Sequence, residues 1–146
     1  MEKKREILEE QIKQALTSTF KVISNHIEDK NSKNKDLEIK TLDFSEIKDL
    51  KSKNDYIRLR ANTDSKALKI RFSDHEIFIK NQPKNPALSK IYELSEKIRC
   101  EMLGSKMLNG IKKNLENNYY QKINYKKYKD VNSKKDINVL DAFELY

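Results

Sequence analysis

Glycine, proline, cysteine and tryptophan are nearly absent from this chain of 146 residues, which contains two glycines, two prolines, one cysteine and no tryptophan. The single cysteine, Cys100, excludes an internal disulfide and suits a reducing compartment. The scarcity of glycine excludes a glycine-rich phosphate loop, and Gly104-Ser-Lys lacks the first glycine and the preceding strand of a Walker motif. No apolar run approaches the roughly 18 residues of a membrane span. Because the first residues also lack a signal-peptide apolar region, we expect a cytoplasmic protein without membrane contact.

Positive charge is abundant, since 31 basic residues face 23 acidic ones and give a formal net charge of +8. Such a balance is typical of proteins that bind nucleic acid. Only five of the basic residues are arginines, however, and the excess of lysine together with abundant Asn and Ile is typical of an A/T-rich genome. The composition therefore disfavours nucleic acid as a partner. A stand-alone basic helical module that binds nucleic acid remains the alternative, and a helical scaffold without a ligand is the third reading.

Candidate catalytic and metal-binding residues are few. His26, His75 and Cys100 share no short ligand spacing such as His-x-x-x-His or Cys-x-x-Cys. Cys100 lies between Arg99 and Glu101 in a helical pattern, which favours packing over a nucleophile that would need a neighbouring base. We expect no catalytic, cofactor-binding or metal-ligating residue in this chain.

Apolar residues recur every three or four positions over three long stretches, and this spacing predicts amphipathic helices. The predicted helices cover residues 2–25, 46–68 and 86–115, the last beginning at a favourable Asn85-Pro86 start signal. Residues 26–36 and 119–129 are polar and predict loops, the second with tyrosines and lysines interleaved. Short strands are predicted at residues 37–42 and 76–80, and a further helical pattern begins near residue 136. The fold class is mainly α, a helical domain with two long helices, an N-terminal helix and at most a short two-stranded β element.

Two features of these helices require an explanation. Polar residues lie on or near apolar stripes, and a charge on a core-facing stripe must be paired or it destabilises the fold. We expect a structural polar cluster, in preference to a ligand site, formed by Arg60, Asp64, Arg71, Arg99 and Glu101. Both glycines, Gly104 and Gly110, fall inside the predicted helix 86–115, where each costs about 1 kcal/mol relative to alanine. They predict a helix-packing site at which another segment approaches the backbone closely.

Two motifs in order resemble one family. Residues 60–74 read Arg-Ala-Asn-Thr-Asp-Ser-Lys-Ala-Leu-Lys-Ile-Arg-Phe-Ser-Asp, and residues 99–115 read Arg-Cys-Glu-Met-Leu-Gly-Ser-Lys-Met-Leu-Asn-Gly-Ile-Lys-Lys-Asn-Leu. They are similar to the stretches Arg-Gly-x-Ala-Asp-Ser-x-Ala-Leu-Arg-Leu-Arg and Arg-Val-Glu-Ala-Ile-Gly-x-x-x-Met-x-Gly-Val-x-x-Asn-Leu of the cobalamin biosynthesis protein CobT family. The chain thus resembles the amino-terminal region of the T subunit of the aerobic, ATP-dependent cobaltochelatase.

The resemblance implies a non-catalytic part in a multi-subunit machine that inserts cobalt into hydrogenobyrinic acid a,c-diamide. It implies two partners, an AAA+ ATPase subunit and the large subunit of cobaltochelatase. The complex would use ATP, magnesium and cobalt, with no cofactor held by this chain. We expect residues 1–146 to form a single helical domain at the start of a longer T subunit. The family's acidic linker and von Willebrand A-type domain, with its Asp-x-Ser-x-Ser metal site, have no counterpart in this sequence.

Overall fold

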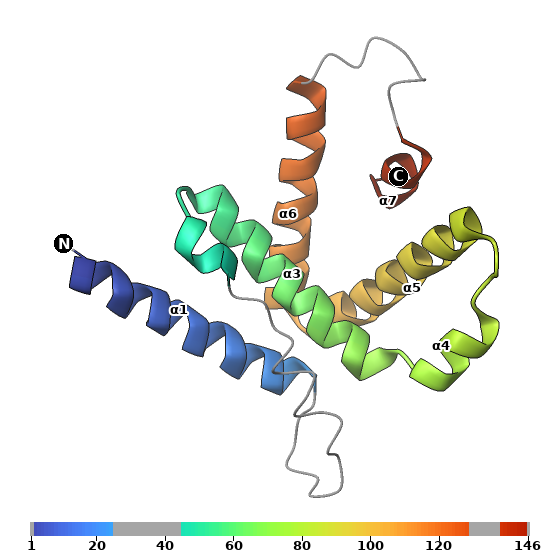
Figure 1. Cartoon of the computed structure of the whole chain (residues 1–146), viewed down its shortest axis with the longest axis horizontal. Helices are drawn as coiled ribbons and strands as arrows, with labels where there is room; N and C mark the ends of the chain where they lie inside the picture. The colour runs from blue at the N-terminus through green and yellow to red at the C-terminus, as the bar shows by residue number, and fades with distance from the viewer. Residues whose placement is uncertain (1, 25–44, 129–137, 146) are drawn as a thin grey trace, which may run out of the picture. The chain divides into compact units, whose positions relative to one another are not determined.

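The structure is a computed structural model that describes residues 2–24, 45–128 and 138–145 (Figure 1). Within these ranges the chain forms α-helices and one 3-10 helix, without a strand. The prediction of a mainly α protein is therefore confirmed. The predicted strand 37–42 and loop 26–36 lie outside the described residues. Two compact units make up the chain, Met1–Arg71 and Phe72–Tyr146, and a single domain over residues 1–146 stays a prediction.

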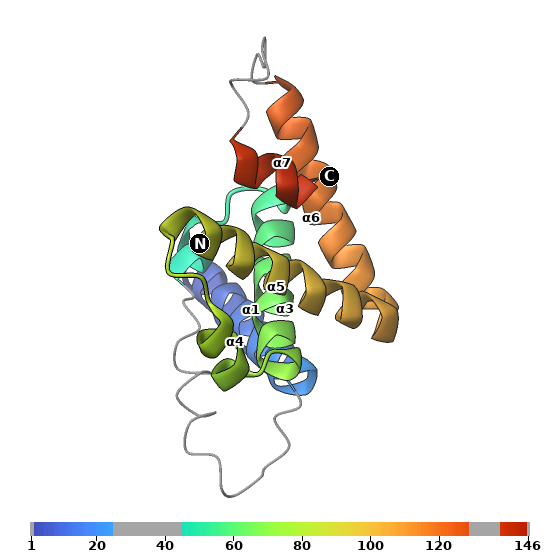
Figure 2. The ribbon, with the colours of Figure 1, turned by 90° about the vertical axis from the view of Figure 1, so that its right-hand side faces the viewer.

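The first unit is built on two helices that run side by side in the same direction, α1 (Glu2–Ile23) and α3 (Lys53–Phe72) (Figures 1 and 2). The 3-10 helix η1 (Ser45–Asp49) lies against α1. One apolar residue from each element, Leu16, Ile47 and Leu59, forms the centre of a buried cluster. The predicted helix 2–25 thus matches α1, and its apolar stripe is the face that packs.

The predicted helix 46–68 is wrong at its start, because the α-helix begins only at Lys53. Ser52 and Asp55 explain the boundary. The Ser52 hydroxyl accepts a hydrogen bond from the Asp55 N–H at 3.2 Å, and the Asp55 carboxylate accepts one from the Ser52 N–H at 3.0 Å. Such a reciprocal capping box satisfies two amides that have no partner in the helix.

The second unit contains α4 (His75–Asn81), α5 (Pro86–Met107), α6 (Asn109–Tyr128) and α7 (Val139–Leu145). The predicted start of α5 is confirmed, since the Asn85 side chain accepts hydrogen bonds from the N–H groups of Ala87 and Leu88 and Pro86 follows it. The helical pattern predicted near residue 136 is confirmed as α7. Figures 1 and 2 show α5 and α6 meeting at an angle, with α7 beside both.

The predicted strand 76–80 is wrong, because these residues belong to α4. Asp74 caps this helix, and its carboxylate accepts a hydrogen bond from the Ile77 N–H at 3.0 Å. Helical geometry also turns Phe78 onto Tyr92 of α5, where the two rings stack with centroids 4.9 Å apart. Capping and ring stacking therefore override the local strand propensity of two isoleucines and a phenylalanine.

The predicted continuous helix 86–115 is also wrong, because α5 ends at Met107 and α6 begins at Asn109. Leu108 between them has extended backbone angles, φ −135° and ψ 111°. Asn and Gly are poor helix formers, so a break in the helix costs least beside Asn109-Gly110. We call the junction of α5 and α6 around Leu108 the elbow. It folds α6 back against α5, which a straight helix could not do.

The predicted loop 119–129 is wrong as far as Tyr128, because α6 continues to that residue. Its lysines and tyrosines alternate without a clear apolar stripe, which is why the pattern read as a loop. Packing supplies what the pattern lacks, since Asn118 is buried and Tyr119 is turned toward α5. Tertiary contacts of this kind stabilise helices beyond their intrinsic propensity.

Candidate functional site

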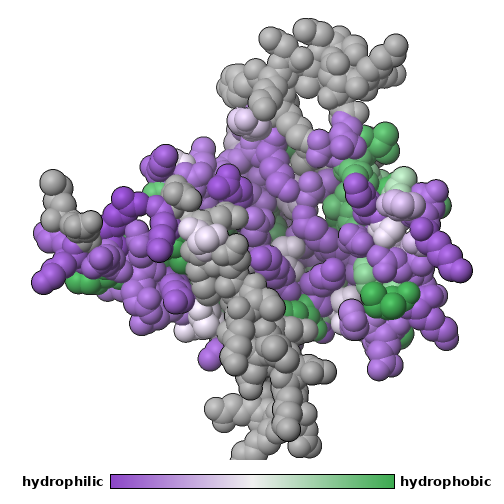
Figure 3. All heavy atoms as spheres, in the orientation of Figure 1, coloured by the Kyte–Doolittle hydropathy of each residue, from purple (hydrophilic) through white to green (hydrophobic). Residues whose placement is uncertain are grey.

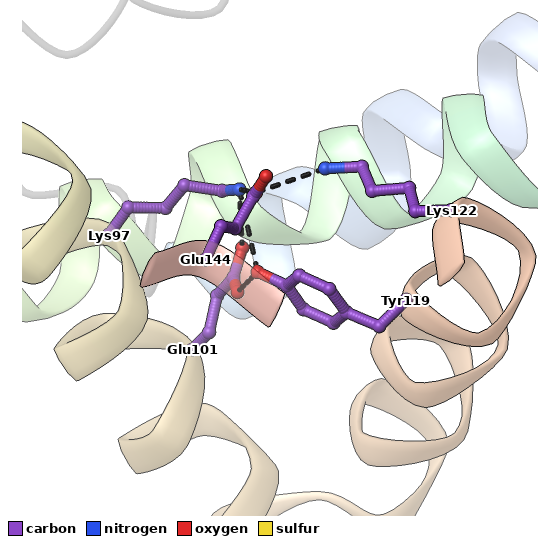
Figure 4. Close-up of polar contacts among 5 residues, drawn as sticks. All are labelled: Lys97, Glu101, Tyr119, Lys122 and Glu144. Carbon is purple, nitrogen blue, oxygen red and sulfur yellow. Dashed lines mark hydrogen bonds and ion pairs between the residues drawn. The ribbon is translucent and has the colours of Figure 1, made fainter. Parts of the chain in front are cut away.

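Five polar side chains from three helices of the second unit meet in one network (Figure 4). Lys97 and Glu101 come from α5, Tyr119 and Lys122 from α6, and Glu144 from α7. We call this group the carboxylate network, because two carboxylates form its centre. Glu101 is buried, and the other four are partly exposed.

One contact of the network joins α5 to α6 directly. The Tyr119 hydroxyl donates a hydrogen bond of 2.6 Å to the Glu101 carboxylate. Burial, and then this hydrogen bond to a carboxylate, raise the pKa of Tyr119 well above its ordinary value. Lys97 lies 3.8 Å from the same carboxylate and donates to the Tyr119 hydroxyl at 3.5 Å. The buried charge of Glu101 is therefore neutralised by partners on both helices.

Glu144 attaches α7 to the other two helices. Its carboxylate accepts hydrogen bonds from Lys97 and, at 3.0 Å, from Lys122. Burial opposes the charged form of Glu144, but the two lysines outweigh it, and the pKa of Glu144 is lowered from its ordinary value. Both amines also lie over the Tyr119 ring, 5.6 Å and 5.3 Å from its centroid. Such cation–π contacts add to the attraction.

A groove of about 560 Å³ lies along α5 and α6 and extends to Glu144 of α7. Glu101, Tyr119 and Glu144 of the carboxylate network are part of its lining. Apolar residues make up much of the rest, and the lysines Lys106 and Lys112 lie at its elbow end. The residues that we use below are Ile98, Met102, Lys106, Lys112, Leu115 and Ile123. A groove of this composition can hold apolar side chains together with anionic groups.

The structure distributes the predicted polar cluster over separate contacts. In the first unit Arg60 lies 3.2 Å from Asp64, whose side chain is 0% exposed. Arg60 also donates to the Thr19 hydroxyl at 3.3 Å, and Arg71 donates to the Ile23 carbonyl at 3.1 Å. The hydrogen bonds from Arg60 and Arg71 connect α3 to α1 at two places along the helices. These contacts are consistent with a structural role for Asp64, Arg60 and Arg71, which stays a prediction.

The two remaining members lie in the second unit and face different partners. Arg99 donates to both oxygens of Glu96 at 2.7 Å and to the Phe72 carbonyl at 2.7 Å. The hydrogen bonds from Arg99 lower the pKa of Glu96 to about 2. Glu101, in contrast, belongs to the carboxylate network. Positions two residues apart on a helix do not face each other, so Arg99 and Glu101 do not form a pair.

The two glycines differ in surroundings. Gly104 is buried in α5, and its carbonyl accepts the Leu108 N–H at 3.0 Å. Gly110 is exposed at the start of α6, and a Cβ added to it would meet no atom within 4 Å. Within the described part of the chain nothing packs on Gly110. Its role in helix packing stays a prediction, which would require that a partner protein packs on Gly110.

Sequence reasoning missed four members of the carboxylate network, Lys97, Tyr119, Lys122 and Glu144. One signal was present, because Lys97 precedes Glu101 by one helical turn, the spacing of an intrahelical ion pair. Nothing in the sequence links α5 to Tyr119 or Glu144, since that link depends on the elbow.

The other candidate groups have simple surroundings. Cys100 is fully buried, and His75 is exposed at the start of α4. Among the described residues no three His, Cys, Asp or Glu side chains form a group that could hold a metal ion. No helix of the described ranges is long and apolar enough to cross a membrane.

Comparison with known families and proteins gives one match. A family model described as cobalamin biosynthesis protein CobT matches residues 8–146. No curated protein sequence and no solved structure matches the chain. The matched range includes both motifs noted in the sequence, the elbow and the whole carboxylate network.

Proposed function

Because the chain belongs to the cobalamin biosynthesis protein CobT family, we propose that it is a non-catalytic assembly domain of the cobaltochelatase T subunit. Membership in the family gives the chain a role in cobalamin biosynthesis. The finer role is the proposal: the domain docks onto the AAA+ ATPase subunit or the large subunit and supports ATP-dependent cobalt insertion into hydrogenobyrinic acid a,c-diamide. The observation that carries it is the family match over residues 8–146.

The division of labour in the complex follows from this proposal. ATP and magnesium belong to the AAA+ subunit, and cobalt is a substrate of the complex. The five side chains of the carboxylate network are occupied by contacts between helices of the second unit. Such an arrangement is suited to a rigid domain that other subunits bind. We place the complex in the cytoplasm.

Co-purification tests the proposal. The tagged chain, at micromolar concentration, is mixed with the purified AAA+ subunit or the purified large subunit, with and without ATP. We expect a stable complex with at least one of them on size exclusion. Absence of any complex under all four conditions would contradict the assembly role.

A second measurement addresses the nucleic-acid alternative. Binding of generic single-stranded DNA at physiological salt, with a steep loss of affinity as salt rises, is typical of a basic nucleic-acid module. We expect weak DNA binding only, and no competition between DNA and the cobaltochelatase subunits.

A further inference from the structure

Several apolar side chains at and near the elbow are exposed. Met102, which lines the groove, is 58% exposed. Further exposed apolar residues lie in the last turns of α5 and at the elbow, namely Leu103, Met107 and Leu108. A small molecule bound in the groove would leave these residues in water. Large apolar side chains exposed within one short segment, Met102 to Leu108, favour a protein interface at the elbow.

Hydrophobic surface elsewhere in the unit provides a comparison. Figure 3 shows hydrophobic atoms over α4 and α7 on a face that is otherwise largely hydrophilic. Ile77 of α4 is 60% exposed and lies outside the groove lining. Apolar exposure by itself therefore does not distinguish the elbow.

Charge does distinguish the elbow end of the groove. Lys106 has no ion-pair partner among the described residues, and Lys112 has only an exposed contact of 3.8 Å to Glu116. The next residue, Lys113, is also exposed. The two other carboxylates of the lining, Glu101 and Glu144, are neutralised within the carboxylate network. The elbow end is thus left positive and favours an anionic partner. A second copy of this chain, with its net charge of +8, would be repelled.

Helix α7 shows how an acidic helix docks on this pair of helices. It is short and amphipathic, with Asp141 and Glu144 as its acidic residues and Leu140 and Phe143 among its apolar ones. Glu144 accepts hydrogen bonds from a lysine of α5 and a lysine of α6. At the elbow end the lining of the same groove likewise includes one lysine of α5, Lys106, and one of α6, Lys112.

We propose that the elbow end of the groove binds an acidic amphipathic helix of a partner protein. The apolar face of that helix packs on Met102 and the exposed apolar residues near the elbow, and its carboxylates pair with Lys106 and Lys112. A third helix laid in the groove between two helices is a common mode of peptide recognition, and methionine adapts to the shape of the incoming side chains. The identity of the partner as a cobaltochelatase subunit rests on the proposed function, whereas the docking chemistry does not.

The first experiment measures docking directly with a synthetic helical peptide of leucines and glutamates. A matched peptide in which lysines replace the glutamates is the control. The full chain is expected to bind the acidic peptide, and to bind it about tenfold more tightly than the basic one. Equal binding of both peptides, or no binding of the acidic peptide, overturns the inference whatever the cobaltochelatase subunits do.

Matched variants locate the site. Met102→Asp and the double variant Lys106→Glu, Lys112→Glu should each weaken binding of the acidic peptide by about tenfold. The controls are Ile77→Asp and the double variant Lys80→Glu, Lys90→Glu, which change equally exposed residues outside the groove. They should change affinity by less than about twofold. Since all these side chains are exposed, the variants are expected to fold, and thermal melting checks this. Equal losses in both sets would overturn the site.

The same variants are then tested against the AAA+ and large subunits. Reduced complex formation by the groove variants alone supports this surface as the docking site. If the wild-type chain binds the acidic peptide but neither subunit, the proposed function fails and the docking chemistry stands. If a subunit binds all variants alike, that subunit docks elsewhere and the groove is not its site.

Discussion

Asp64 shows how one residue can hold two helices. Its carboxylate is fully buried and lies within 3.2 Å of the Arg60 guanidinium, which also donates to Thr19 of α1. A buried ion pair contributes little compared with an apolar pair, but removal of one partner leaves the other without compensation. Asp64 is therefore important mainly because its removal would leave Arg60 unpaired and destabilise the fold.

Replacement of Asp64 by asparagine should lower the free energy of unfolding by about 2–4 kcal/mol, because Arg60 then keeps its charge without the carboxylate. Urea denaturation followed by circular dichroism measures the loss. The control is Asn62→Ala, an exposed position on the same helix, which should change stability by less than about 0.5 kcal/mol. An unchanged melting temperature for the Asp64 variant would show that the buried pair is not structural.

At the scale of elements, the elbow decides which helices meet. Glu101 and Tyr119 are 18 residues apart, which would separate them by about 27 Å along one straight helix. In the folded unit their side chains form a hydrogen bond of 2.6 Å. The turn at Leu108 thus creates the α5–α6 pair, the groove and the carboxylate network together.

Replacement of Tyr119 by phenylalanine should destabilise the chain by about 1–3 kcal/mol, because the buried Glu101 loses its closest hydrogen-bond donor. The neighbouring Tyr120 is 67% exposed and provides a matched control. The variant Tyr120→Phe should stay within about 0.5 kcal/mol of wild type. Chemical denaturation of both variants under identical conditions tests the difference. Equal stability of the two would mean that the network does not hold α6 on α5.

For the molecule as a whole, the ionised contacts define the pH range of stability. The pKa values of Glu96 and Glu144 are lowered in the folded chain, that of Glu96 to about 2 from an ordinary value of 4.5. Their contribution is complete above their ordinary pKa of 4.5 and is lost as the pH falls through their lowered pKa values, which for Glu96 is about 2. The pKa of Tyr119 is raised above its ordinary value of 10.0. Its contribution is complete below pH 10 and is lost as the pH rises further, because the unfolded state releases the phenolic proton first.

The stability of the chain should therefore be greatest between about pH 5 and pH 10, with a fall on either side. Urea denaturation at a series of pH values measures the profile. In the variant Glu96→Gln, the loss of unfolding free energy at acidic pH should be smaller by about 1–2 kcal/mol. This value is reduced because Arg99 is accessible to solvent, which screens the ion pair. Tyr119→Phe should flatten the alkaline side and leave the acid side unchanged. A variant profile parallel to that of wild type over the whole range would contradict the assignment.

Local signals predicted most of the helices. The spacing of apolar residues identified α1 and most of α3, and Asn85-Pro86 identified the start of α5, because these signals act within a few residues. Two capping residues went unused, Ser52 and Asp74, and they account for the late start of α3 and for α4 in place of a strand. Both could have been read from the sequence, since each precedes a helix at the proper spacing.

The sequence by itself determined the mainly α fold, the CobT family and the positive charge, because periodicity, motif order and composition are properties of the chain in order. Only the tertiary structure decided that the two glycines lie on either side of an elbow. It also decided that Glu101 meets Tyr119, and that Lys106 and Lys112 share one groove. These facts depend on residues distant in sequence, whose contacts form only when the chain folds back at Leu108 and buries the facing sides of α5 and α6.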